Sequence, residues 1–186
     1  MTINARLASM RAHAAAHRVP VMSPANTDFV CQLLAQYRPV RVLEIGTATG
    51  VSAAAMALSL LSWGGTLTTI EISVPTHAAA QANFAALGLR NVRCMCGDAR
   101  VLLRDWKAAG EPLFDAVFID AQKSQTHVFY QAALSVLGRG GLVIVDDVWR
   151  YRHKMAAFYG FLAQQQQAYS LHCVDEQDAT MVIRLR

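Results

Sequence analysis

Val42-Leu43-Glu44-Ile45-Gly46-Thr47-Ala48-Thr49-Gly50 is the stretch that decides the fold of this chain. An apolar, strand-like run reaches a carboxylate, passes through a turn bracketed by two glycines, and enters an Ala-rich helical pattern after Gly50. Glycine lets a backbone turn come close to a ligand, and open α/β sheets bind their ligands at the carboxyl ends of strands. Alone, the stretch therefore predicts a site for a nucleotide-like cofactor after the first strand.

Strand-like and helix-like segments alternate from Val40 onward. Strands that alternate with helices of about 10–15 residues indicate βαβ units and a parallel sheet. A short polar turn around residues 175–178 joins the last two strands, which requires antiparallel pairing. We therefore expect one α/β domain over residues 1–186, with a mostly parallel seven-stranded sheet, a C-terminal antiparallel hairpin and helices on both faces. The strand candidates are residues 40–45, 66–70, 92–96, 116–119, 142–145, 169–174 and 180–185.

Residues that favour helix ends mark several helix boundaries. Ser23 and Asp98 are expected to cap the helices that follow them, since their side chains can accept hydrogen bonds from the first backbone N–H groups. Ser124 is expected to cap a helix that ends near Leu137. The glycine-rich residues 138–141 would then form a loop before the next strand.

The net charge of +4 has a local origin. Arg6, Arg11 and Arg18 precede the first acidic residue, Asp28, and the rest of the chain is nearly neutral. Residues 1–22 are expected to form a helical segment that could be mobile, although an Arg- and Ala-rich start could also mimic a transit peptide. No uninterrupted apolar run reaches the ~18–20 residues that cross a bilayer. We expect a cytoplasmic protein without membrane contact, and the charge gives little reason to expect nucleic acid.

Acidic residues end five successive strands of the predicted sheet. Parallel strands bring their carboxyl ends to one edge, so these groups should lie close together. Unpaired carboxylates beside buried strands are costly, which makes a shared binding role more plausible than solvation. The acidic positions are Glu44, Glu71, Asp98, Asp120, Asp146 and Asp147.

A dinucleotide site is the first alternative for the glycine turn. The turn reads Gly-x-x-x-Gly and lacks the Gly-x-Gly-x-x-Gly spacing that places a helix N-terminus on a pyrophosphate. Glu44 stands two residues before the first glycine, where it would repel phosphate and attract a cationic group. The turn therefore favours a positively charged ligand without phosphates.

In these features the chain resembles the class I S-adenosylmethionine-dependent methyltransferases. More narrowly, it is similar to the metal-dependent O-methyltransferases typified by catechol and caffeoyl-CoA O-methyltransferases, which implies a Rossmann-like methyltransferase fold. The resemblance extends from about Pro20 to the C-terminus, and its specific part is Asp-Ala-x-Lys at residues 120–123 with a pair of acidic residues after the next strand. The segments that carry it are residues 42–52, 69–72, 97–100, 114–123 and 140–148.

The resemblance implies a binding site for S-adenosylmethionine. Its implied contacts are Glu44, Gly46 and Ser52 at the methionine part, Glu71 at the ribose, Ile72 against the adenine ring, Asp98 and Ala99 at the adenine edge, Met22 and Ser23 in a closing segment, and Thr47 and Asp120 as further contacts.

The resemblance also implies a metal site and a general base. Asp120, Asp146 and Asp147 match three ligands of a divalent cation, Mg²⁺ or else Ca²⁺ or Mn²⁺, all of which prefer oxygen ligands. Lys123 matches the proposed general base and could accept a proton if burial and the cation lower its pKa from ~10.4. The family usually has an amide where this chain has Asp147, and the added charge should tighten cation binding.

The expected function is methyl transfer to a hydroxyl of a small, catechol-like acceptor. Trp149 and Tyr151 follow the acidic pair and could line the acceptor pocket, or they could simply pack. A basic cluster, Arg150, Arg152 and Lys154, could meet an acidic substrate, although a solvated surface is the simpler reading.

Two alternatives remain open. The first is a related enzyme that modifies a hydroxylated base in tRNA through the basic cluster. The second is a non-catalytic protein that binds S-adenosylmethionine, because the connection from Asp147 to the helix near residues 155–164 is shorter than the family usually has. The family is often dimeric, so a homodimer is also a possible assembly.

Overall fold

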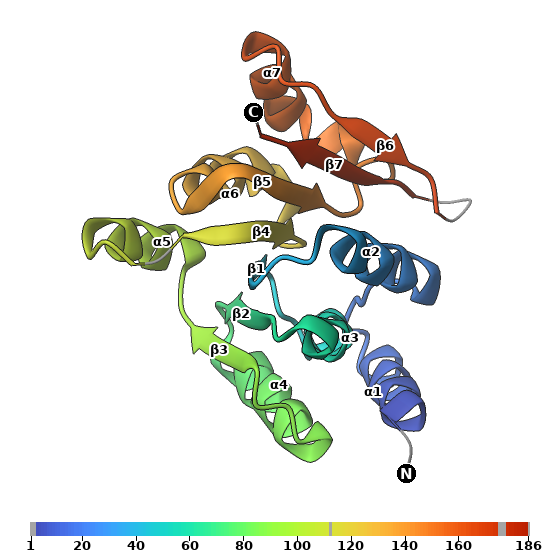
Figure 1. Cartoon of the computed structure of the whole chain (residues 1–186). Helices are drawn as coiled ribbons and strands as arrows, with labels where there is room; N and C mark the ends of the chain where they lie inside the picture. The colour runs from blue at the N-terminus through green and yellow to red at the C-terminus, as the bar shows by residue number, and fades with distance from the viewer. Residues whose placement is uncertain (1–2, 112, 175–177, 186) are drawn as a thin grey trace.

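A computed structural model describes residues 3–111, 113–174 and 178–185 (Figure 1). Its centre is a seven-stranded sheet in the order β3-β2-β1-β4-β5-β7-β6. Strands β1 to β5 are parallel, and β7 pairs antiparallel with both β5 and β6. The predicted sheet and its C-terminal hairpin are confirmed, whereas residues 175–177 of the expected turn lie outside the described residues. The strands are β1 (Arg41–Ile45), β2 (Thr66–Glu71), β3 (Val92–Cys96), β4 (Phe114–Ile119), β5 (Leu137–Val145), β6 (Ser170–His172) and β7 (Thr180–Arg184).

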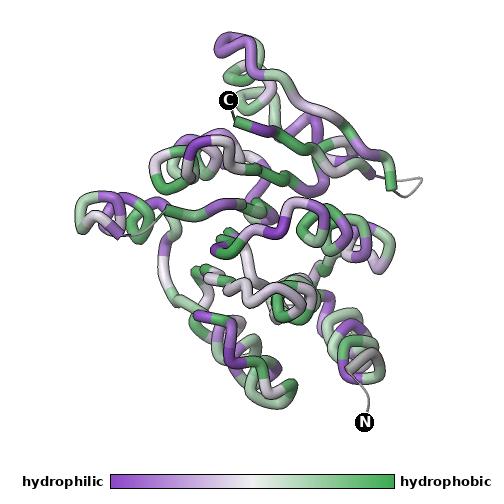
Figure 2. The backbone as a smooth tube through the Cα atoms, in the orientation of Figure 1, coloured by the Kyte–Doolittle hydropathy of each residue, from purple (hydrophilic) through white to green (hydrophobic). Residues whose placement is uncertain are grey.

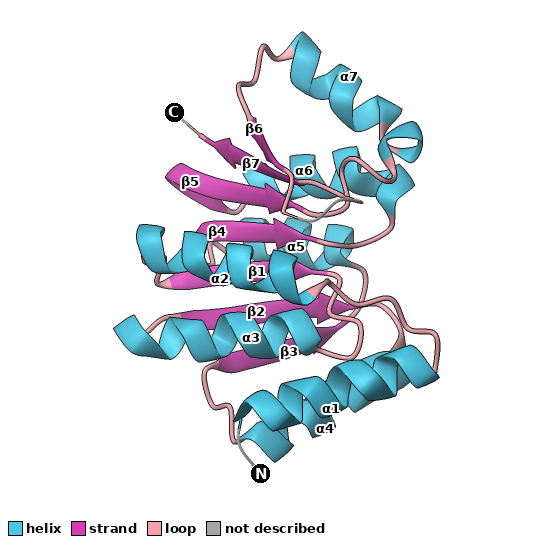
Figure 3. Ribbon diagram, turned by 90° about the vertical axis from the view of Figure 1, so that its right-hand side faces the viewer, coloured by secondary structure: helices cyan, strands magenta, loops and turns pink. Residues whose placement is uncertain are grey.

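Helices cover both faces of the sheet, with α2 and α3 on one face and α5 and α6 on the other (Figure 3). Neighbouring residues of β1 divide between two cores: Val42 packs with α2 and α3, whereas Leu43 and Ile45 pack with α5, α6 and α7. Burial on both faces explains why the strands read as continuous apolar runs. The helices carry both hydrophobic and hydrophilic stretches (Figure 2). They are α1 (Ile3–Ala16), α2 (Pro24–Tyr37), α3 (Val51–Leu60), α4 (Val74–Leu87), α5 (Ala99–Ala108), α6 (Thr126–Leu134) and α7 (Ala156–Gln164), with 3-10 turns η1 (Leu61–Trp63), η2 (Lys123–Gln125) and η3 (Arg152–Lys154).

Two of the predicted helix caps are confirmed. The Ser23 hydroxyl accepts a hydrogen bond from the Asn26 backbone N–H at 3.1 Å, at the start of α2. The Asp98 carboxylate accepts one from the Arg100 backbone N–H at 2.9 Å, at the start of α5. Both caps satisfy backbone donors that a helix leaves without a partner.

The predicted helix from Ser124 to Leu137 is wrong at both ends. Ser124 lies inside the 3-10 turn η2, and α6 starts after it without a side-chain cap. Leu137 already belongs to β5, where it pairs with Phe114 before the register shifts. A Cβ at Gly141 would lie 2.6 Å from Leu137 Cγ, so the glycine run supports an irregular strand where a loop was expected.

The N-terminal segment is helical, as expected. Met10 of α1 is buried in the same core as residues of α2 and α3, and Ala14 of α1 is also buried. Arg11 donates to the Met22 carbonyl oxygen and, at 2.8 Å, to Thr27 Oγ1, which ties α1 to the segment that enters α2. Within the described part of the chain, no helix is long and apolar enough to span a membrane.

Candidate active site

The turn after β1 packs directly against the end of β4. These strands are neighbours in the sheet although two βα units separate them in sequence, which is the topological switch point of an open α/β sheet. The Asp120 N–H donates to the Ile45 carbonyl at 3.0 Å, and the Gly46 N–H donates to the Ile70 carbonyl at 3.0 Å. Gly46 has a φ of +100°, and a Cβ there would lie 2.2 Å from the Asp120 carbonyl oxygen. Only glycine fits this close approach.

A cavity of about 260 Å³ opens at the switch point. Six expected cofactor residues line it together, namely Gly46, Glu71, Ile72, Asp98, Ala99 and Asp120. The other lining residues, which the sequence did not single out, are Ile45, Ile70, Gly97, Arg100, Ala121, Gln122, Gln125 and Phe129. Gln122 lies within the Asp-Ala-x-Lys element and could have been found from it, whereas no motif signals Phe129.

The Glu71 carboxylate is fixed at the rim of this cavity. One of its oxygens accepts from the Ala48 N–H and the other from the Ser73 N–H, both at 2.9 Å. A carboxylate has about four acceptor positions, so capacity remains for two more donors. Ile72 follows directly with 68% of its surface exposed, which offers a flat apolar contact beside the carboxylate.

Asp98 and Arg100 form a forked ion pair beside Glu71. Arg100 Nε lies 2.9 Å from Asp98 Oδ1, and Arg100 Nη2 lies 2.5 Å from Oδ2. Hydrogen bonds from Arg100 keep the pKa of the Asp98 carboxyl below its ordinary value. Asp98 is therefore held in place as an anion, while its adenine contact stays a prediction.

Glu44 lies beneath the turn and does not line the cavity. It is fully buried and accepts from Ser52 Oγ at 2.6 Å and from Thr69 Oγ1 at 2.5 Å, and Thr47 Oγ1 lies 2.5 Å from the same Thr69 oxygen. Burial raises the pKa of Glu44 to about 7, although the two hydroxyls act to lower it. Three expected cofactor residues thus form one buried network that supports the turn.

Met22 and Ser23 also lie outside the residues that line the cavity. Met22 is buried, with 5% of its surface exposed, and Ser23 caps α2. A closing role for this segment remains a prediction.

Lys123 bridges two of the expected metal ligands. Its Nζ lies 2.6 Å from Asp120 Oδ1 and 2.9 Å from Asp147 Oδ2. Burial acts to lower the pKa of Lys123, but the charges of Asp120 and Asp147 outweigh it and raise the pKa above its ordinary value. The expected lowering of the pKa of Lys123 is therefore not found in this arrangement, where Lys123 is a charged ammonium.

Asp146 has neutral partners. Its Oδ1 accepts from Thr180 Oγ1 at 2.9 Å and from Asn26 Nδ2 at 3.3 Å. Burial, together with the charges of Asp120 and Asp147, raises the pKa of Asp146 to about 7. Sequence reasoning missed Asn26 and Thr180; a polar Asn26 on the buried face of an otherwise amphipathic helix was the available signal.

Asp178 organises the segment after Asp147. Its Oδ1 accepts from the N–H groups of Trp149 and Arg150 at 3.1 Å, and from its neighbour Ala179 at 2.7 Å. Burial, together with the neighbouring Asp147 carboxylate, raises the pKa of Asp178 above its ordinary value. The sequence reading placed Asp178 in a polar turn and gave it no role.

The carboxylate cluster fits a divalent cation in its chemistry. Asp120, Asp146 and Asp147 offer oxygen atoms, the donors that Mg²⁺ and Ca²⁺ prefer. The position of the Lys123 ammonium shows that one point can lie close to oxygens of both Asp120 and Asp147. Among the described residues, no three His, Cys, Asp or Glu side chains already surround such a point. Lys123 would have to move for the cation to bind, so the metal centre stays a prediction.

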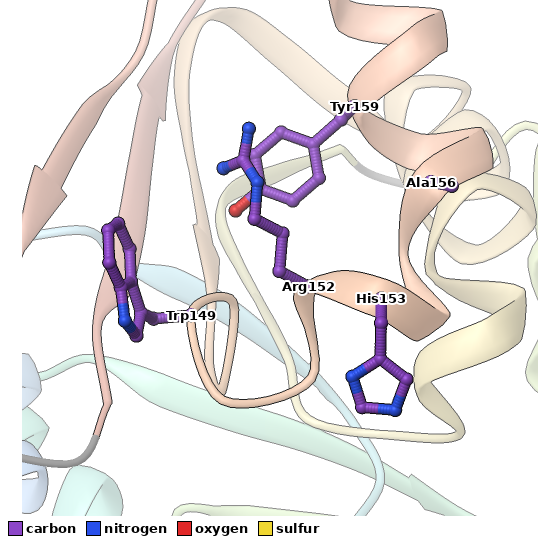
Figure 4. Close-up of a pocket in the computed structure, with 5 residues that line it drawn as sticks. All are labelled: Trp149, Arg152, His153, Ala156 and Tyr159. Atoms are coloured by element: carbon purple, nitrogen blue, oxygen red, sulfur yellow. The ribbon is translucent and has the colours of Figure 1, made fainter.

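A second, larger cavity is lined by residues that follow Asp147 closely in the sequence. It has a volume of about 630 Å³ and is lined by Trp149, Arg152, His153, Ala156 and Tyr159 (Figure 4). The Arg152 guanidinium lies over the Tyr159 ring, 4.1 Å from its centre. Trp149 lies two residues after Asp147, so this cavity begins where the acidic pair ends.

Fold and site together define an α/β protein of the Rossmann-like methyltransferase type, with its ligand cavity at the switch point. The model of the O-methyltransferase family matches residues 3–165, and the chain belongs to that family.

Two curated relatives and one solved structure illustrate this membership. The chain is 38% identical over 132 residues to a catechol O-methyltransferase of Niastella koreensis, and 35% identical over 131 residues to one of Mycobacterium tuberculosis. Each match covers 69% of this chain but only 58% and 57% of the relatives. The matched part thus spans less than two thirds of their length. An O-methyltransferase from Bacillus cereus, solved in complex with SAH, shares the fold with a TM-score of 0.83 at 23% identity, over 99% of this chain and 92% of that one.

Proposed function

We propose that this protein is an S-adenosylmethionine-dependent O-methyltransferase that acts on a small, catechol-like acceptor with help from a divalent cation. The observation that carries the proposal is the cavity at the switch point, where Glu71 and Asp120 are lining residues and the Lys123 ammonium lies 2.6 Å from Asp120. The names of the two curated relatives support the catechol-like acceptor.

The cavity suits the nucleoside part of the cofactor. Glu71 keeps acceptor capacity for two ribose hydroxyls, because each of its oxygens receives one backbone donor. Ile72 offers an exposed apolar face to the adenine ring. Gly46 lets the backbone come close to the methionine part, and the buried network around Glu44 supports that turn.

The reaction needs an activated hydroxyl. A methyl sulfonium is a good electrophile, whereas a neutral hydroxyl is a weak nucleophile, so the acceptor must lose its proton as the methyl group moves. A divalent cation held by Asp120, Asp146 and Asp147 would bind two adjacent acceptor oxygens and lower the pKa of one hydroxyl. Lys123 would take up that proton at Nζ only if the bound cation drew Asp120 and Asp147 away from it, because their charges now keep it an ammonium.

The transfer itself is a single displacement. The acceptor oxygen forms a bond to the methyl carbon, the carbon–sulfur bond breaks, and its electron pair stays on sulfur as a neutral thioether. Asp120 lines the cofactor cavity and also contacts Lys123, which supports a position for Asp120 between the two reactants. Positioning of this kind supplies a large part of the rate of a two-substrate reaction.

Two measurements test the proposal. Calorimetry should detect S-adenosylmethionine binding to the protein, and Glu71→Ala should weaken it at least about tenfold, since two charge-assisted hydrogen bonds are lost. Glu111→Ala, which removes an exposed carboxylate outside the cavity, is the matched control. Mass spectrometry should then find a methylated catechol. Binding without any turnover on a panel of acceptors would favour a non-catalytic cofactor-binding protein.

The basic cluster favours one alternative, methylation of a hydroxylated base in tRNA. Arg150 and Lys154 lie over the ring of Tyr151, and Arg152 lies over Tyr159, so cations and aromatic rings are interleaved on this surface. Such a surface would bind tRNA with a steep dependence on salt. Methylation of tRNA but not of catechols would support this alternative.

A further inference from the structure

We propose that the acceptor is an anionic catechol, in which a carboxylate on the ring substituent binds Arg152 while the ring lies beside Trp149. This inference rests on the proposed function and names the substrate class of the same site. It concerns the cavity of about 630 Å³ lined by Trp149, Arg152, His153, Ala156 and Tyr159, called the acceptor cavity below.

The acceptor cavity lies within reach of the carboxylate cluster. Consecutive Cα atoms are about 3.8 Å apart, so the Cα of Trp149 lies within about 7.6 Å of that of Asp147. Asp178 fixes this segment by accepting the Trp149 N–H at 3.1 Å. The Tyr159 hydroxyl donates to the Val148 carbonyl at 2.9 Å and so anchors α7 on the same segment. One ring with a short substituent can span such a distance.

The charge of the acceptor cavity is suited to an anion. Arg152 and His153 line it, and no acidic side chain appears among its lining residues within the described chain. The Arg152 guanidinium lies over the Tyr159 ring, 4.1 Å from its centre, and its five N–H donors are more than the contact with Tyr159 can use. Within the described part of the chain, Arg152 makes no ion pair with a carboxylate. A planar fork held in this way can bind a carboxylate through two parallel hydrogen bonds.

The aromatic residues account for the ring of the acceptor. Trp149 has 58% of its surface exposed, and its indole stands across an opening from Arg152 and Tyr159 (Figure 4). Tryptophan supplies a large apolar surface for contact with a planar ring. The cavity volume lies within the 300–1,000 Å³ typical of small-molecule sites. It exceeds what a bare catechol ring fills, which leaves room for an acidic substituent.

The test compares acids with matched neutral acceptors on the full chain. The pairs are 3,4-dihydroxybenzoate with its amide, and 3-(3,4-dihydroxyphenyl)propanoate with its amide, beside catechol itself. We expect each acid to exceed its amide at least about tenfold in kcat/KM, mainly through KM, because a charge-assisted pair is formed. The longer acid should exceed the shorter one if Arg152 lies further from the hydroxyls than one ring reaches.

Variants of Arg152 separate binding from folding. Arg152→Gln should raise KM for the acids about 10- to 100-fold more than it raises KM for the matched amides, while Arg152→Lys should restore part of the preference for the acids. Arg139→Gln, which changes an exposed arginine near the start of β5, should alter KM neither for the acids nor for the neutral acceptors. An unchanged melting temperature in each variant confirms that the fold is intact.

Each other outcome overturns a different statement. Equal kcat/KM for acids and amides, or an Arg152→Gln variant that weakens both alike, overturns the anionic acceptor and leaves the proposed function standing. Methylation of tRNA in place of any catechol overturns the anionic catechol in favour of a nucleic-acid substrate. Cofactor binding without methylation of any acceptor overturns the proposed function itself.

Discussion

Gly46 is the residue on which the turn after β1 depends, because an added Cβ would lie 2.2 Å from a backbone oxygen of Asp120. We expect Gly46→Ala to lower the free energy of unfolding by about 2–3 kcal/mol, since its φ of +100° is strained for alanine and β4 cannot move away. Chemical denaturation measures this loss. Gly110→Ala is the matched control, because Gly110 has a φ of +68° but nothing within 4 Å of an added Cβ. Equal losses in both variants would contradict the close packing.

Glu44 should make the stability of the fold depend on pH. Burial raises its pKa from 4.5 to about 7, so the folded state binds this proton more tightly than the unfolded state does. The stabilisation from the protonated form is full below about pH 4 and is lost as the pH rises to about 7. This difference in the pKa of Glu44 between the unfolded and folded states corresponds to roughly 3 kcal/mol of stability.

Glu44→Gln removes this titration. The unfolding free energy of the variant relative to the natural protein should therefore rise between pH 5 and pH 8, as measured by denaturation at each pH. Glu111→Gln, at an exposed position, should run parallel to the natural protein. Parallel curves for Glu44→Gln as well would show that Glu44 stays ionised when buried.

Single residues also show how far sequence could predict the site. The acidic ends of the strands located Glu71 and Asp120 at the cavity, because parallel strands end at one edge. The charge of Lys123 could not be predicted, since its pKa depends on the position of Asp147, which follows a different strand. Patterns along the chain reveal which groups meet but not how they share protons.

At the scale of elements, α2 links the fold to the site. Its cap is Ser23, and Asn26 in its first turn donates to Asp146 at 3.3 Å. Ser23→Ala should cost about 1 kcal/mol in stability and should also weaken S-adenosylmethionine binding several-fold, because the first turn of α2 loosens next to the carboxylate cluster. Thermal denaturation and calorimetry measure the two effects.

Ser73→Ala is the matched control for Ser23→Ala. Ser73 caps α4 with a hydrogen bond to the Thr76 N–H at 3.4 Å, and its own N–H, which binds Glu71, is retained in the variant. It should cost similar stability without the loss of binding. If both variants bind the cofactor as the natural protein does, α2 does not support the site in this way.

Element boundaries were predicted well where local chemistry sets them and poorly where tertiary packing does. The caps at Ser23 and Asp98 act through hydrogen bonds within four residues, so their signals are local. The start of β5 depends on pairing of Leu137 with Phe114, which lies on a separate strand. The glycines that follow Leu137 signal an interruption, but only the partner strand decides between a loop and a bulge.

At the scale of the whole molecule, the candidate site draws on one helix and on three neighbouring strands that are far apart in sequence. Asn26 comes from α2, Asp120 follows β4, Asp146 follows β5, and Thr180 begins β7. No local pattern links these four positions, so Thr180 could not be assigned to the site from sequence, and the only signal for Asn26 was a polar residue on the buried face of its helix. The homodimer expected from the family resemblance remains a prediction.

The central claim is that this edge of the sheet transfers a methyl group with the help of a divalent cation. The most direct measurement is the rate of methyl transfer from S-adenosylmethionine to 3,4-dihydroxybenzoate after chelation, with and without added Mg²⁺. We predict a rate at least about 100-fold lower in chelator, in line with the loss of several kcal/mol of charge stabilisation, and full recovery when Mg²⁺ is restored. An unchanged rate in chelator would contradict the metal site at Asp120, Asp146 and Asp147.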